Sequence, residues 1–159
     1  MSAGGWPSVT SGAAYPVQTE TGTNKVNYFS TSFAQSGQNY QEFGIVMPSD
    51  YDGGTVTAIF EWTTTSSSTN SVVWQIAGLS YPDNTAIDTV YGSNATVTDA
   101  NNAANVVNKT GATGACTLGG TPAASQFTQF RIGRNGGSGS DNLAATALLL
   151  GVIITYTRT

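Results

Sequence analysis

Hydrophobic and polar residues alternate along several stretches of this chain, and the clearest stretch is residues 55–63. Its apolar parity consists of Val56, Ala58, Phe60 and Trp62. The opposite parity is polar except for Ile59. A period of two residues is typical of a strand with one buried face, so this segment predicts a half-buried β-strand.

Further β-rich stretches follow one another along the chain, separated by residues that favour turns. The longer ones are residues 26–33, 40–47, 72–81, 126–134 and 148–157, and the shorter ones are 86–91, 95–98, 105–109 and 115–118. Residues 49–54 and 135–141 are rich in Gly, Asp, Asn and Ser, which predicts hairpin-type turns there. Residues 143–150 contain good helix formers, but the β-branched residues that follow favour a strand.

These patterns indicate eight to ten short antiparallel strands and no helix. We therefore predict an all-β, single-domain β-sandwich or jelly roll over residues 25–159. Residues 1–24 show no period and are rich in Gly, Ser, Thr and Pro, which predicts an extended N-terminal arm. The isolated Trp6, Tyr15 and Val17 are the candidate contacts of this arm, either with its own domain or with a partner.

The composition limits the chemistry that the chain can perform. It has no His, a single Cys and 9% charged residues, against about 25% in an average protein. Side chains for acid/base, nucleophilic or metal-assisted catalysis are therefore scarce. We expect no enzymatic activity, no cofactor and no bound metal.

The charges argue against two classes of partner. Only five basic residues are present and the net charge is −4, so no basic stripe can neutralise the phosphates of a nucleic acid. A membrane-spanning helix needs about 18 consecutive apolar residues, and the nearest stretch, residues 144–154, is too short. We expect neither nucleic acid nor a membrane as a partner.

The carboxylates offer two alternatives to a purely structural role. Glu42 and Glu61 are the one pair on predicted strands, as glycoside hydrolysis by two facing carboxylates would require. Residues 50–54 resemble a calcium loop but lack its remaining ligands, and a cation bound by Asp83, Asn84 and Asp88 is a similarly weak candidate. Solvent-facing strand residues account for the first pair, and turns account for the other two segments, so we favour the structural interpretation of all three.

The remaining residues with distinctive chemistry fit a packed core. Trp62 and Trp74 share parity with core residues, so we expect burial and not a sugar-stacking platform. This leaves Trp6 as the exposed tryptophan. Cys116 lies in a small apolar setting and is expected to be a buried, inert thiol.

Several segments together resemble the jelly-roll virion structural proteins of tailed phages. The resemblance covers residues 26–157 and is carried by residues 43–48 with 50–56, 60–62, 73–75, 83–88 with 91–92, 121–124, and 131–141 with 149–152. It implies a capsid decoration (cement) protein or a tail appendage, often trimeric. It supplies no catalytic residue.

The resemblance leads to our first functional hypothesis. It is a capsid decoration protein that is made in the cytoplasm of the host bacterium, forms a homotrimer, and binds the major capsid protein on the capsid surface of the virion. The alternative is a tail-fibre or receptor-binding module that recognises host carbohydrate through loops such as residues 63–71 and 135–141.

Overall fold

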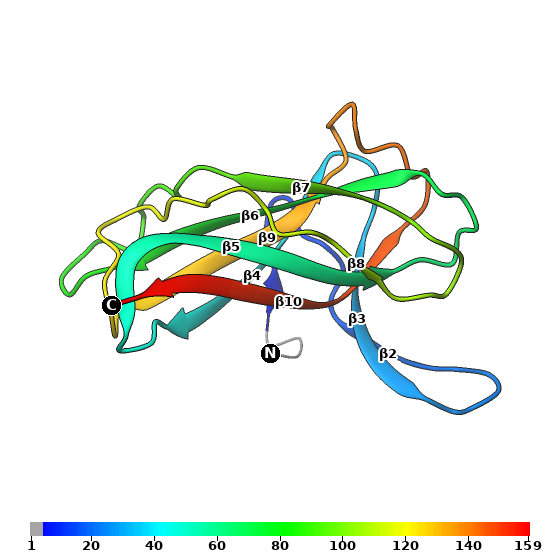
Figure 1. Cartoon of the computed structure of the whole chain (residues 1–159), viewed down its shortest axis with the longest axis horizontal. Helices are drawn as coiled ribbons and strands as arrows, with labels where there is room; N and C mark the ends of the chain where they lie inside the picture. The colour runs from blue at the N-terminus through cyan, green and yellow to red at the C-terminus, as the bar shows by residue number, and fades with distance from the viewer. Residues whose placement is uncertain (1–4) are drawn as a thin grey trace.

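The computed structural model describes residues 5–159, which form ten β-strands and no helix. The strands form two five-stranded sheets that pack face to face (Figure 1). In spatial order, one sheet contains β1 (Trp6–Pro7), β4 (Gln38–Val46), β9 (Phe127–Asn135), β6 (Ser71–Tyr81) and β7 (Ala95–Ala100). The other contains β2 (Val17–Glu20), β3 (Asn27–Phe33), β10 (Ala147–Arg158), β5 (Tyr51–Thr63) and β8 (Asn108–Lys109). The predicted β-sandwich of eight to ten antiparallel strands is confirmed.

The core follows from the alternation along the strands. Val56, Ala58, Phe60 and Trp62 of β5 all point inward and are fully buried. Trp74 of β6 lies opposite them, and its ring stacks on that of Phe60 with centroids 5.3 Å apart. Stacked and edge-on aromatic pairs of this kind add to the free energy gained from burial alone. The predicted burial of Trp62 and Trp74 is confirmed.

The predicted connections are partly wrong. Residues 49–54 were expected to form a hairpin turn, but β5 already begins at Tyr51, and β4 and β5 belong to different sheets. Residues 135–141 likewise lead from one sheet to the other and not through a hairpin. Turn-forming residues indicate where the chain reverses, but they do not indicate which sheet the next strand joins.

Two of the short predicted strands are also wrong. Residues 86–91 form a loop, with Ile87 and Val90 exposed, and residues 115–118 make only an isolated bridge between Cys116 and Val56. The end of this loop packs closely on residues 115–118, since a Cβ atom on the adjoining Gly92 would lie 1.9 Å from the Thr117 carbonyl oxygen. β-rich composition predicts a strand only where a neighbouring edge is available for pairing.

The N-terminal segment lies against both sheets. In β1, Trp6 pairs with Glu42 and Pro7 with Gln41, while β2 pairs with β3 over residues 27–30. Ala13, between the two, is buried in the core cluster. The N-terminal segment therefore contacts its own domain, which is one of the two surfaces expected for it. The domain boundary at residue 25 stays a prediction.

A buried ion pair joins the two sheets at one end of the sandwich. Arg134 of β9 is 0% exposed and forms a two-pronged contact with Asp141, with Nε–Oδ2 and Nη2–Oδ1 distances of 2.9 and 2.7 Å. Its other N–H groups donate to the carbonyl oxygens of Phe33, Leu143 and Ala145. All five guanidinium donors are thus satisfied. Asp141 also accepts a hydrogen bond from the backbone N–H of Val73.

We predict that Asp141→Asn lowers the free energy of unfolding by about 3–5 kcal/mol, because it leaves the Arg134 charge buried without its counter-charge. The matched control is Asp50→Asn, at the exposed pair with Arg158, which should cost about 1 kcal/mol or less. Denaturant unfolding of the three proteins measures both values. Equal stability of the two variants would contradict this account of Arg134.

Candidate functional site

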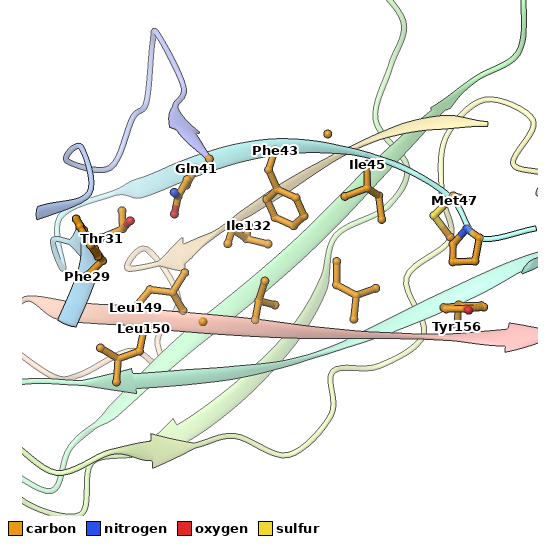
Figure 2. A pocket seen from close by; sticks show the side chains of 16 residues that line it. Phe29, Thr31, Gln41, Phe43, Ile45, Met47, Ile132, Leu149, Leu150 and Tyr156 are labelled. Atoms are coloured by element: carbon orange, nitrogen blue, oxygen red, sulfur yellow. The ribbon is translucent and has the colours of Figure 1, made fainter. Parts of the chain in front are cut away.

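An apolar groove runs along one flank of the sandwich, between β4 of one sheet and β10 of the other (Figure 2). Its volume is about 280 Å³. Phe43 and Ile45 of β4 point into it from one wall, and Leu149 and Tyr156 of β10 lie along the other. These residues face the core, yet they are not covered on this side, so the groove is a place where the interior of the sandwich reaches the surface.

The groove exists because β3 accompanies β10 over only a short distance. The two strands pair only over residues 147–149 of β10, which lie opposite residues 31–33 of β3. Beyond Thr31, β3 turns outward and pairs with β2 instead. No described residue pairs with this edge of β10 over residues 150–157, whose other edge is paired with β5.

The opposite wall also ends in an open strand edge. β1 pairs with β4 only at Gln41 and Glu42, and the backbone of residues 8–13 contacts Tyr40. Over residues 43–46, the edge of β4 away from β9 has no partner among the described residues. Two open strand edges therefore border the same groove, and open edges are sites where further strands can add.

A β-bulge shapes the β10 wall of the groove. Leu149 pairs with Trp62 and Gly151 with Glu61, so Leu150 is an extra residue in β10 without a counterpart on β5. The bulge resets the alternation, and as a result both Leu149 and Val152 lie opposite inward-facing residues of β5. The apolar face of β10 therefore continues along the groove.

The groove has the chemistry of a packing surface. None of its 16 lining residues carries a charge, and the polar ones include Thr31, Gln41 and Tyr156. The Tyr156 hydroxyl donates to Asp50 at 3.0 Å, so it is already occupied. Such a groove favours apolar side chains and disfavours an unpaired charge.

The predicted contact residues of the N-terminal segment are exposed. The exposed fractions are 48% for Trp6, 75% for Tyr15 and 56% for Val17. They are not gathered into one site, since Trp6 belongs to β1 and Val17 to β2, in different sheets. Their role as partner contacts stays a prediction.

Glu42 and Glu61 are not brought together. Each alternates with inward-facing residues of its strand, and the strands belong to different sheets, so the two carboxylates lie on opposite outer faces. Glu42 accepts a hydrogen bond from Gln129 at 2.7 Å, and Glu61 lies 3.6 Å from the Lys109 ammonium. The two-carboxylate arrangement of a glycosidase does not form from this pair.

The candidate calcium ligands of residues 50–54 are engaged in other contacts. Asp52 accepts from the N–H of Gly54 at 2.8 Å, and Asp50 contacts Tyr156 and Arg158. Asn84 has a positive φ of 63°, as Asn often does in a turn. Within residues 5–159, no three His, Cys, Asp or Glu side chains gather as a metal-binding group.

Cys116 is fully buried, and burial raises the pKa of its thiol, with a smaller opposing effect from a backbone hydrogen bond. A thiol of this kind is a poor nucleophile at neutral pH.

The described part of the chain contains no helix long and apolar enough to cross a membrane.

An arginine held between two tyrosines was not predicted. The Arg131 guanidinium carbon lies 4.4 Å from the centre of the Tyr40 ring and 4.5 Å from that of Tyr91. This stack fixes the loop that bears Tyr91 onto the outer face of β9. Burial, and next the charge of Glu42, raise the pKa of the Tyr91 hydroxyl.

Comparisons with known proteins give no family assignment. No family model matches the chain, and no curated protein matches it. Among solved structures, the chain is similar to a cycloisomaltooligosaccharide glucanotransferase from Paenibacillus sp., complexed with cycloisomaltoheptaose, with 8% identity and a TM-score of 0.47. The match covers 93% of this chain and 17% of that protein, so the chain spans about a sixth of the enzyme's length.

We predict that the free energy of unfolding falls as the pH rises above about 10, the usual pKa of tyrosine. The pKa of Tyr91 is raised in the folded state, so its stabilising contribution is complete below that pH and is lost as the hydroxyl ionises. Tyr91→Phe should flatten the decline by up to about 1.4 kcal/mol per pH unit. Denaturant unfolding between neutral and strongly alkaline pH measures it, with Tyr15→Phe as the control for loss of a hydroxyl. An unchanged slope in Tyr91→Phe would refute the prediction.

Proposed function

We propose that this chain is a non-enzymatic structural protein of a phage virion, namely a capsid decoration protein that binds the major capsid protein and stabilises the head. The observation that supports an assembly role is the apolar, uncharged groove with an open strand edge on each side. A monomeric enzyme normally covers such edges, because they promote association. In an assembly protein they provide the contact surface.

The surface composition supports the same proposal. With 9% charged residues, the outer faces present mainly Thr, Ser, Asn, Gln and exposed apolar side chains. Uncharged hydrogen-bonding groups lose less free energy on desolvation than ions do, so they suit contacts that stay buried in a particle. The resemblance of residues 26–157 to tailed-phage virion proteins supports the choice of a phage virion.

The test is binding to phage heads that lack this protein. Heads from a phage with the encoding gene deleted are mixed with the purified chain, and the bound fraction is measured after sedimentation. We expect saturable binding and a higher temperature of head disruption. Absence of binding, together with specific binding to a glycan array, would replace this proposal with the carbohydrate-recognition alternative.

We further predict that Trp6→Ala weakens head binding by about tenfold or more, since a large exposed aromatic side chain is the typical energetic centre of an interface. The matched control is Val9→Ala, which changes a fully exposed residue of the same segment and should leave the affinity within about twofold. Titration of heads with each variant measures the two affinities. If both variants bind like the unmodified protein, Trp6 is not a contact residue.

A further inference from the structure

The β2–β3 hairpin, residues 17–30, projects from the body of the sandwich (Figure 1). All four residues of β2 are exposed, and so are Val26 and Phe29. A two-stranded hairpin is marginally stable in water unless one face packs on something. The exposed apolar residues of this hairpin therefore identify it as an element that needs a second surface.

The hairpin's charges are confined to its tip. Glu20 and Lys25 lie 3.5 Å apart and neutralise each other. Along the strands themselves, Val17, Thr19, Tyr28 and Phe29 carry no charge. The strands of the hairpin away from its tip and the lining of the groove thus share one property, because neither carries a charge that contact would bury.

The hairpin of the same chain contributes the side chain of Phe29 to the groove lining but no strand beside residues 150–157 of β10. β3 leaves β10 at Thr31, at one end of the groove, and continues away from it as part of the hairpin. The open edge of β10 spans residues 150–157, about 26 Å at 3.3 Å per residue. The four paired residues of the hairpin need about 13 Å of it.

We infer that the β2–β3 hairpin of one copy docks in the groove of a second copy and adds a strand beside residues 150–157 of β10. The backbone N–H and C=O groups of the open edge then gain partners, and apolar hairpin side chains cover Ile154 and its neighbours in the groove. This inference rests on the proposed function, since it names the partner of the groove that we assign to assembly. The contact is head-to-tail, which generates a closed ring or an open chain of copies.

The first experiment follows association of the purified full chain by sedimentation velocity over a wide range of concentrations. We expect oligomers in the unmodified protein. Ile154→Lys blocks the groove, and its fold should survive because the lysine side chain extends from a half-buried position to solvent. The double variant Val17→Asp/Val26→Asp alters only exposed hairpin residues. Each should weaken association by about tenfold or more.

The decisive experiment mixes these two variants. The groove variant retains a working hairpin and the hairpin variant retains a working groove, so the mixture should form a complex of two chains and nothing larger. Ile153→Lys, whose side chain lies on the outer face of β10, is the matched control and should associate normally. Ile45→Lys, on the other wall of the groove, repeats the test if Ile154→Lys does not fold.

Three results would overturn the inference. They are a monomeric unmodified protein at every concentration, a mixture that stays monomeric while the unmodified protein associates, and an Ile153→Lys variant as defective as Ile154→Lys. No heads are present in these experiments. A monomer that still binds heads would therefore refute hairpin docking and leave the proposed function standing.

Discussion

The placement of the Arg134 guanidinium between the sheets is the constraint on which the rest of the molecule depends. Its hydrogen bonds reach Asp141 and Leu143 in the β9–β10 connection, and Phe33 at the end of β3. A buried cation requires that every donor be satisfied, so these segments have little freedom to move. Phe33 is also paired with Ala147 of β10. The same contact thus fixes where β3 and β10 meet.

The groove between β4 and β10 begins where this fixed contact between β3 and β10 ends. β3 pairs with β2 over residues 27–30 and with β10 only near Phe33, which leaves one edge of β10 over residues 150–157 without a partner among the described residues. The bulge at Leu150 keeps apolar residues facing the gap. The low charge of the chain has a related effect, because neither wall of the groove contains an ion that would lose its hydration when an uncharged strand covered it. The short pairing of β3 with β10 therefore accounts both for the fixed end of the sandwich near Phe33 and for the open strand edge along the groove.

The sequence predicted local structure far better than it predicted spatial arrangement. Alternation along β5 identified the inward residues, including Trp62, because a period of two follows directly from strand geometry. The same logic failed for residues 49–54 and 135–141, whose composition signals a reversal but not a change of sheet. Arg134 gave no signal at all, since a charged residue on a strand is usually exposed. The groove could not be predicted from the sequence either, because it depends on the residue at which β3 stops pairing with β10.

The central position of β10 in its sheet has a consequence for the time at which the fold can form. β10 lies between β3 and β5, yet it comprises residues 147–158, more than eighty residues after either neighbour along the chain. During synthesis on the ribosome, β3 and β5 therefore emerge and wait without the strand that joins them. Neither the groove nor its open edge exists until β10 has been made. A nascent chain consequently cannot present this surface until β10 has been synthesised.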